Sequence, residues 1–469
     1  MEDTVKTEKR GFWNFIDNIK GDKVVWIIVF MLIMISILAV FSSTSLLALQ
    51  AKTDRLAIIK EQIITAAGGL AVIWAFCRIK RIGVFMMLSQ LGFIASFALL
   101  ALLLMEVDFG EMFKAVKING VYRALRIFKL QIHVYEFVKV AMVMYLAWAL
   151  HSFKKDQEEI SLTGESSTFA FVNALSKTKN FEFLARPVWK MAIYMYIPIG
   201  IICLMIMPGS NSSAIFVGGI LVATLLVGGV QMRKILMLAV LGIGLLAGVV
   251  GIHLLSGGKA IKRVGTFLSR IEADYSAEQL EKVPAKSAEF YDILDEIKQP
   301  YSAKVAVHEG GILGKGSGNS TQKYVVAVMY GDYMYSFIIE EYGLWGAIFV
   351  IILYVSLLAR GSMIARLCEN EFAKIAVGGL SVLITGQAFM HMFVNVDIGP
   401  MTGQTLPLIS HGSSAFLMFS AAFGVILSIS RMARKRIQQE EEAAIPIYDS
   451  SRDDIQASLD ILEQIDNGL

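Results

Sequence analysis

Gly310-Gly-Ile-Leu-Gly-Lys-Gly-Ser-Gly-Asn-Ser-Thr-Gln-Lys323 is a polar stretch between two very apolar halves of the chain. Its five glycines allow backbone conformations that other residues avoid. The run from Tyr324 to Gly343 that follows is apolar and aromatic, yet it carries Asp332, Glu340 and Glu341. Because a carboxylate in an apolar run is costly to bury, this stretch is the first candidate for a functional site.

The rest of the chain has the composition of a membrane protein. Of its 469 residues, 55% are hydrophobic, and the mean hydropathy is +0.60. Several apolar runs approach the roughly 20 residues that a helix needs to span a bilayer, and they lack the alternation of a β-barrel. The sequence therefore predicts an all-α polytopic membrane protein with about ten transmembrane helices. The predicted spans are Val24–Leu49, Leu56–Cys77, Ile82–Met105, Tyr135–Leu150, Val188–Met207, Ser213–Val230, Ile235–Leu255, Met334–Ala359, Phe372–Val394 and Gly412–Ile429.

These spans divide the chain into three parts. Residues 1–23 form a polar segment, which is too polar for a cleavable signal peptide. Residues 24–431 form the transmembrane domain, and residues 432–469 form an acidic tail. Residues 256–323, between the seventh and eighth spans, form one large loop. Within it, Ile261–Ile271 have the spacing of an amphipathic helix, either on the membrane surface or packed on the loop.

Basic residues in the short loops predict the orientation of the chain. With ten spans, most of them fall on one side, so both termini are expected to be cytoplasmic. The loop between the third and fourth spans is the exception, with several basic residues on the outer side. Either a span is miscounted, or these residues have a role, such as binding a lipid phosphate, that outweighs the topology bias. They are Lys114, Lys117, Arg123, Arg126 and Lys129.

Several function classes are not supported by the sequence. Cys77, Cys203 and Cys368 are an odd, scattered set in or beside apolar segments, which argues against a disulfide framework and a zinc site. The sequence contains no P-loop, no GxGxxG before a helix and no HExxH motif. Nucleotide hydrolysis, redox chemistry and nucleic-acid binding are therefore not expected.

The run Tyr324–Ala359 is too long for one straight crossing. As a helix it would extend about 54 Å at 1.5 Å per residue, whereas a bilayer core is about 30 Å thick. We therefore expect a break near the carboxylates, with Asp332 at the outer surface. A half-desolvated Asp332 would have a raised pKa and could take a proton from a sugar hydroxyl, or it could cap a helix starting at Tyr333. We expect Glu340 and Glu341 to pair with Arg or Lys of neighbouring spans.

The segment from Asn395 to Ser414 joins the last two spans on the same outer side. It has little charge, many small and hydroxyl residues, and two prolines. Irregular backbone at membrane depth is tolerated only where it is buried in protein or lines a wet cavity. This favours a re-entrant cavity wall, and a plain tight turn is the alternative.

These motifs together resemble those of the SEDS family (FtsW, RodA and SpoVE). Gly314–Lys323, Gly331-Asp332 and Glu340–Gly343 resemble the family signature GxGxGNSxQK…TDFIFxxxxEELG. Thr402–Ser410 resembles TGxxLPLIS, with a lean toward the division members of the family. Two further matches are Val40–Ser45, similar to VYSASS, and Asn119–Lys139, similar to NGxxRW…QPxELxK. The family also has ten spans with a large outer loop after the seventh.

The resemblance implies a peptidoglycan glycosyltransferase that polymerises lipid II during septal cell-wall synthesis. Asp332 corresponds to the catalytic Asp, which would act as base while undecaprenyl diphosphate leaves with inversion. Cations should stabilise this leaving group, and the candidates are Arg123, Lys139 and Lys323. The other predicted substrate-binding residues are Gly318, Asn319, Ser320, Gln322, Pro407, Ser410, Ser413 and Ser414. Glu136 is expected to be structural, like Glu340 and Glu341. A divalent cation (Mg²⁺ or Mn²⁺) is compatible with the diphosphate, but no ligand cluster demands one.

The chain departs from the family pattern at several positions, which are Ala124, His133-Val134, His391 and His411-Gly412-Ser413. His391 and His411 are either acid–base groups or polar packing residues. The implied partners are lipid II and other undecaprenyl lipids, a class B penicillin-binding protein that acts as transpeptidase, and other division proteins. The implied location is the bacterial inner membrane at the septum. A lipid II transporter and a division scaffold without catalysis are the alternatives.

Overall fold

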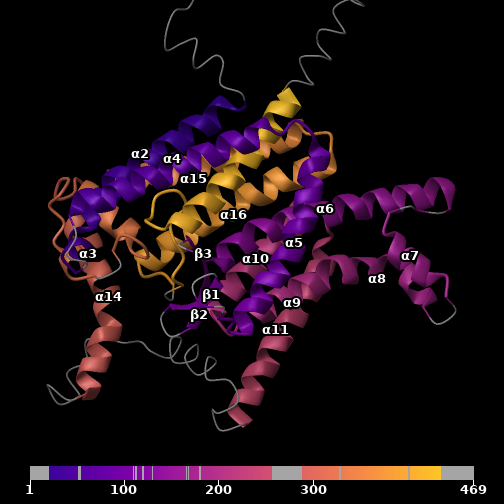
Figure 1. Ribbon diagram of the computed structural model, residues 1–469, viewed down its shortest axis with the longest axis horizontal. Helices are drawn as coiled ribbons and strands as arrows, with labels where there is room; N and C mark the ends of the chain where they lie inside the picture. Colours follow the sequence, from indigo (N-terminus) through magenta and orange to yellow (C-terminus); the bar gives the residue numbers. More distant parts are fainter. Residues whose placement is uncertain are drawn as a thin grey trace, which may run out of the picture.

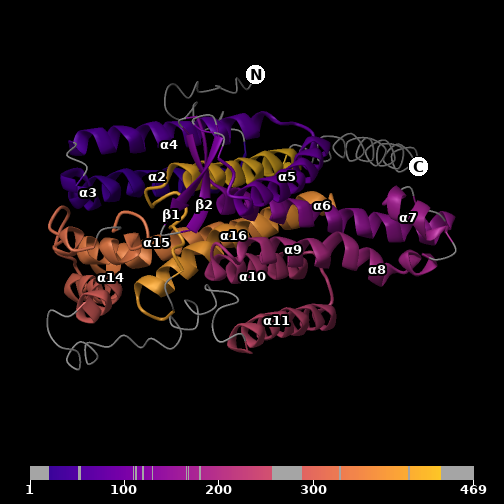
Figure 2. The ribbon, with the colours of Figure 1, turned by 60° about the horizontal axis from the view of Figure 1, so that its bottom comes forward.

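A computed structural model describes residues 21–434 except 51–53, 109, 111–112, 119–120, 129, 165, 167, 179–180, 256–287, 327–328 and 400–401. It is a bundle of long helices, with a small sheet whose strands run across the helices (Figures 1 and 2). The long helices are α2 (Lys23–Ser43), α4 (Arg55–Arg78), α5 (Ile82–Leu104), α6 (Val134–Thr163), α10 (Asn211–Val227), α11 (Met232–Leu255), α15 (Met334–Leu367), α16 (Glu371–Asn395) and a last helix, Ser413–Arg434. The fifth span combines α8 (Pro187–Met191), a π-helix η2 (Ala192–Tyr196) and α9 (Ile197–Ile206).

Each predicted span coincides with one of these helical stretches. Among the described residues, eight helices are long and apolar enough to cross a membrane, and α10 is a shorter apolar helix. Three predicted boundaries were wrong, one of them the end of the eighth span, which continues as α15 beyond Ala359 to Leu367. The first span ends at Ser43, and a separate helix α3 (Ser45–Gln50) follows Thr44. The fourth span continues as α6 beyond the predicted end at Leu150 and stops only before Gly164, whose φ of 75° suits glycine.

Two connecting segments have more structure than the sequence predicted. The basic loop between α5 and α6 forms an antiparallel sheet of β1 (Phe113–Ile118), β2 (Val121–Ile127) and β3 (Leu130–His133). The large loop predicted at 256–323 contains helix α14 (Ala288–Gly310), which packs on α15. The predicted amphipathic helix at 261–271, the tail from 435 and residues 1–20 lie outside the described residues. The remaining short elements are α7 (Ala170–Ser176), η1 (Glu182–Ala185) and η3 (Gln322–Tyr324).

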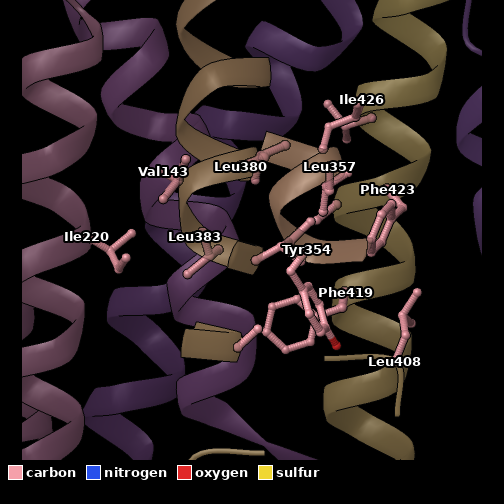
Figure 3. Packing of buried hydrophobic residues seen from close by; sticks show 14 of the residues in the cluster. Val143, Ile220, Tyr354, Leu357, Leu380, Leu383, Leu408, Phe419, Phe423 and Ile426 are labelled. Atoms are coloured by element: carbon pink, nitrogen blue, oxygen red, sulfur yellow. The ribbon is translucent and has the colours of Figure 1, made fainter. Parts of the chain in front are cut away.

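The hydrophobic core lies where α6, α10, α15, α16 and the last helix meet. Figure 3 shows Tyr354 of α15 beside Phe419 of the last helix, and Leu383 of α16 on the side of Val143 and Ile220; all of these side chains are buried. Small residues allow close helix packing, since a Cβ at Gly361 would overlap the hydroxyl of Ser381. This core holds rigid the helices that carry the candidate site.

One end of the bundle joins the beginning and the end of the described chain. The Asp22 carboxylate caps α2 by accepting hydrogen bonds from Val24 N and Val25 N at 3.0 and 3.2 Å. Its other oxygen accepts a hydrogen bond from Arg360 Nε at 2.8 Å, and Asp22 N donates to Ser430 Oγ at 3.0 Å. We call these contacts the Asp22 clasp. The clasp gathers α2, α15 and the last helix at one end, and the opposite end carries Asp332.

Candidate active site

The apolar run after Tyr324 breaks twice, and a carboxylate stands beside each break. Residues 329–333 form turns, and α15 begins only at Met334, directly after Asp332 and Tyr333. Gly343 then interrupts α15 with φ 67° and ψ −164°, directly after Glu340-Glu-Tyr342. Such a conformation is essentially restricted to glycine. The predicted break near the carboxylates is therefore confirmed.

Glu340 fixes the glycine-rich loop to α15. The buried Oε1 atom accepts hydrogen bonds from Lys315 Nζ at 2.9 Å, from Thr321 N at 2.8 Å and from Gln322 N at 3.3 Å. Ser320 Oγ donates to Oε2 at 2.5 Å. A carboxylate with this many donors serves as an anchor for the loop rather than as an acid or base.

Glu341 joins the same loop to the first helix. Its Oε1 accepts a hydrogen bond from Ser42 Oγ at 2.6 Å and lies 3.6 Å from Lys323 Nζ. Lys323 is buried and also donates to the carbonyl of Gly318 at 2.6 Å. The cationic partners of Glu340 and Glu341 therefore come from the loop, not from neighbouring spans as the sequence predicted.

Asp332 differs from these glutamates, because its carboxylate accepts no hydrogen bond from the described residues. Burial raises the pKa of Asp332 to about 6, and the positive charge of Arg123 nearby opposes this rise. Its side chain faces Gly403, where an added Cβ would lie 3.9 Å from Oδ2. The alternative that Asp332 caps the helix is wrong, since the N-cap residue is Tyr333 and no side chain caps from there.

Helix α16 supplies the cap that Asp332 does not. Asn395 Oδ1 accepts a hydrogen bond from Ser336 N at 2.9 Å, and Asn395 Nδ2 donates to the carbonyl of Asp332 at 2.9 Å. His391 Nε2 accepts from Tyr335 N at 3.4 Å, and its Nδ1 lies 2.7 Å from the carbonyl of Gln404. Because both ring nitrogens of His391 are engaged by backbone groups, the polar packing alternative is favoured over an acid–base role.

Arg123 is placed by an irregularity in the sheet. Val116 pairs with Ala124, but the next pair is Lys117 with Tyr122, so Arg123 is the extra residue of a β-bulge. Bulges are frequent near active sites because they redirect a side chain. Arg123 Nε donates to the carbonyl of Gly209 at 3.1 Å, and its guanidinium is close enough to Asp332 to lower the pKa of that carboxyl.

Lys139 forms a buried polar centre between three segments. Its Nζ donates to Glu136 Oε1 at 2.7 Å, to Gln387 Oε1 at 2.6 Å and to Gln404 Oε1 at 2.9 Å. These bonds connect α6, α16 and the segment before the last helix. All three protons of the ammonium group are used, so a bound phosphate would have to displace one of these acceptors. A role of Lys139 at the diphosphate stays a prediction.

The segment after α16 is irregular and partly buried, and it is not a tight turn; that it forms the wall of a cavity stays a prediction. Residues 404 and 406–410 are buried. Ser410 Oγ donates to the carbonyl of Gly331 at 2.8 Å, and the Pro407 carbonyl accepts from Tyr354 Oη at 2.5 Å. Ser414 Oγ accepts from His133 N at 3.2 Å, whereas Ser413 is exposed. This packing holds the segment against the turn that carries Asp332.

The remaining predictions concern exposed loop residues, His411 and a metal. Gly318 and Asn319 are exposed at the surface of the glycine-rich loop. His411 Nδ1 lies 2.8 Å from Gln62 Oε1, and burial lowers the pKa of His411. Among the described residues, no three His, Cys, Asp or Glu side chains cluster as metal ligands. The involvement of a divalent cation stays a prediction.

The sequence did not predict the residues that hold the candidate site residues in place. Gln387 and Gln404 complete the Lys139 centre, and Lys315 completes the loop anchor. An amide inside an apolar span, such as Gln387, is a usable signal, because a polar group there needs a partner. Nothing in the sequence indicated the bulge at Arg123, since it depends on how β1 pairs with β2.

Comparison with known proteins gives consistent results. Residues 22–435 match the FtsW, RodA and SpoVE family, described as cell cycle proteins. The probable peptidoglycan glycosyltransferase FtsW of Bacillus subtilis is 34% identical over 29% of this chain and 34% of its own length. The peptidoglycan glycosyltransferase MrdB of Escherichia coli K12 is 34% identical over 27% and 35%. The chain thus spans about a third of the length of these two relatives.

Longer matches cover most of the chain at lower identity. The probable FtsW of Methylococcus capsulatus is 28% identical over 79% of this chain and 80% of its own length. A chain of a peptidoglycan synthase complex, studied for polymerization and crosslinking, superposes with a TM-score of 0.58 at 20% identity, over 88% of this chain and 98% of that one. The rod shape determining protein RodA of Thermus thermophilus gives 0.52 at 17% identity, over 88% and 98%. These two structures share the fold of the chain.

Proposed function

Because the chain belongs to the FtsW, RodA and SpoVE family of cell cycle proteins, we propose that it is a peptidoglycan glycosyltransferase that polymerises lipid II. The observation that carries this proposal is the Asp332 carboxylate. This carboxylate is half-buried, and its pKa is raised to about 6. It does not cap helix α15, because Asn395 accepts the hydrogen bond from Ser336 N. A base with such a pKa is ionised at neutral pH and is a stronger proton acceptor than an ordinary aspartate.

In the proposed reaction, the Asp332 carboxylate accepts the proton of the 4-hydroxyl on the acceptor sugar. The oxygen attacks the anomeric carbon of the donor sugar from the face opposite the diphosphate. A new glycosidic C–O bond forms with inversion, the bond from this carbon to the diphosphate oxygen breaks, and undecaprenyl diphosphate leaves with the bonding electrons. The proton stays on Asp332 until it is released to solvent.

Arg123 is the cation best situated to stabilise the leaving diphosphate. It already acts electrostatically on Asp332, and a fixed cation beside the reacting groups stabilises charge that develops in the transition state. Lys139 and Lys323 are buried and bonded within the protein. We assign them to holding the site in shape.

We also propose that the chain works with a single-span transpeptidase of the class B penicillin-binding proteins at the division septum. A polymer strand must be crosslinked after it is made, so the two activities belong together. The relative from the peptidoglycan synthase complex supports such an assembly.

The test is lipid II polymerisation in detergent, with and without the co-expressed transpeptidase. We expect glycan strands from the wild type and none from Asp332→Asn at equal protein recovery. Asp397→Asn is the matched control, because this exposed carboxylate only pairs with Lys304, and it should keep full activity. An active Asp332→Asn variant would disprove the base. A folded wild type that makes no product in either condition would disprove the activity.

A further inference from the structure

The hairpin between β2 and β3 has an unusual tip. Ile127 of β2 pairs with Leu130 of β3, and Phe128 lies in the turn between them. Phe128 has φ 54°, a left-handed conformation that Asn or Gly adopts without strain in such turns. Its side chain is 66% exposed. Within the described part of the chain, a large apolar side chain is therefore held in a strained conformation and left mostly exposed.

Cations surround this tip on the sheet. Lys114 of β1 lies directly opposite Arg126 of β2, and like charges opposite each other destabilise a sheet. Lys114 pairs with Asp108 at 2.6 Å, but the exposed Arg126 has no hydrogen bond or ion pair within the described residues. Lys117 is exposed and lies over the ring of Tyr122 at 4.8 Å. Of these three cations, only Lys114 has a carboxylate partner among the described residues.

The position of the sheet relative to the membrane indicates what surrounds the tip of the hairpin. The three strands connect the end of α5 at Leu104 to the start of α6 at Val134, two helices long and apolar enough to cross a membrane. In Figure 2 the strands run across the direction of the long helices. The sheet therefore lies where the helices leave the hydrocarbon layer, which is the level of lipid headgroups at the Asp332 end.

We propose that this hairpin is a lipid-binding site, in which Phe128 inserts at the acyl boundary and Arg126, with Lys114 and Lys117, binds the phosphate of an anionic phospholipid headgroup. An aromatic side chain flanked by cations is the combination that anchors proteins at membrane interfaces. Lipid contact provides the apolar packing that Phe128 lacks. It also explains why the chain keeps basic residues in a loop where the topology bias opposes them.

A spin label at position 128 tests the insertion directly. The label is placed by Phe128→Cys in a chain whose three native cysteines are replaced by alanine, and the protein is reconstituted in vesicles with or without phosphatidylglycerol. We expect the label at 128 to be more accessible to oxygen than to a water-soluble nickel chelate when phosphatidylglycerol is present. A label at Leu91, an exposed side chain inside α5, marks the membrane, and one at Leu162, 84% exposed beyond the apolar part of α6, marks water.

The headgroup contact is tested by charge removal with the label in place. Combined Arg126→Gln and Lys114→Gln should reduce the response to phosphatidylglycerol at least several-fold, whereas Arg366→Gln, an exposed cation at the other end, should not. A label at 128 that behaves like the one at Leu162 in both lipids would overturn the insertion. Equal insertion in neutral and anionic vesicles would overturn the phosphate contact. Protection of the label only after the transpeptidase is added would replace the lipid by a protein partner. All three readouts are independent of glycan polymerisation.

Discussion

At the scale of single residues, the raised pKa of Asp332 depends on neighbouring residues that cap helix α15 in its place. An aspartate next to a helix start would ordinarily be drawn into capping the free N–H groups. Here Asn395 and His391 satisfy Ser336 N and Tyr335 N from another helix. The carboxylate is left without a hydrogen-bond donor that would lower its pKa, and burial raises the pKa to about 6.

The pH dependence of polymerisation follows from this pKa. The base must be ionised, so activity should be lost as pH falls through about 6 and should be constant above it. Arg123→Gln removes the charge that lowers the pKa of Asp332, so the midpoint of the profile should move to higher pH. Lys117→Gln, on the same sheet, is the control and should leave the midpoint in place. A midpoint that stays near pH 4 in the wild type would contradict the assignment.

The cap itself can be tested through Asn395. Asn395→Ala leaves the buried Ser336 N without an acceptor, which should cost about 1–3 kcal/mol of stability. Asn395→Asp keeps the acceptor but loses the donor to the Asp332 carbonyl, and its added negative charge should raise the pH midpoint of activity. Thermal unfolding in detergent and the pH profile measure the two effects separately. Wild-type values for both variants would show that α16 does not position Asp332.

At the scale of elements, the predicted and observed structures agree where the signal is local. Apolar runs of sufficient length predicted the long apolar helices, because each can satisfy its own backbone and bury its side chains in lipid or protein, whereas the polar helix α14 was not predicted. The sheet, the bulge at Arg123 and the extension of α6 to Thr163 were not predicted. They depend on contacts between distant residues, such as the buried ion pair of Asp156 on α6 with Lys190 on α8 at 2.7 Å.

The kink at Gly343 is the element-scale feature with the clearest consequence. A Cβ there would overlap the Ile312 carbonyl, and the backbone conformation suits only glycine. Gly343→Ala should therefore destabilise the protein by about 1–3 kcal/mol and loosen the loop 311–325. Limited proteolysis and thermal unfolding measure this. Gly200→Ala, at a helical glycine with open space around it, should be neutral. If both variants resist the protease equally, the kink at Gly343 does not hold the loop 311–325 in place.

At the scale of the whole molecule, the site depends on polar contacts that cross the bundle. Composition predicted the membrane fold, and the motifs predicted that Asp332 lies at the site. Neither predicted that the Lys139 ammonium group would donate all of its hydrogen bonds to Glu136, Gln387 and Gln404. A residue type at a motif position does not reveal whether its charge faces a ligand or the interior, because that depends on which helices meet there.

The Lys139 centre should be one of the costliest places to alter. Lys139→Met leaves the half-buried Glu136 carboxylate without its buried cation, and breaking a fully buried pair in this way costs about 3–5 kcal/mol, which is the upper limit here. The double variant with Glu136→Gln removes the uncompensated charge and should regain much of that loss. Thermal unfolding of the single and double variants measures the coupling. Additive losses would show that the pair does not act as a unit.

The Asp22 clasp brings the two ends of the described helical bundle together, which is the geometry that circular permutation requires. Since Asp22 N bonds to Ser430 Oγ at 3.0 Å, the first and last helices meet at one point. A short linker from Arg434 to Asp22 could close the polypeptide into a ring, and the ring could be cut at the exposed turn near Gln231, between α10 and α11. Compact domains with adjacent termini commonly tolerate such circular permutation.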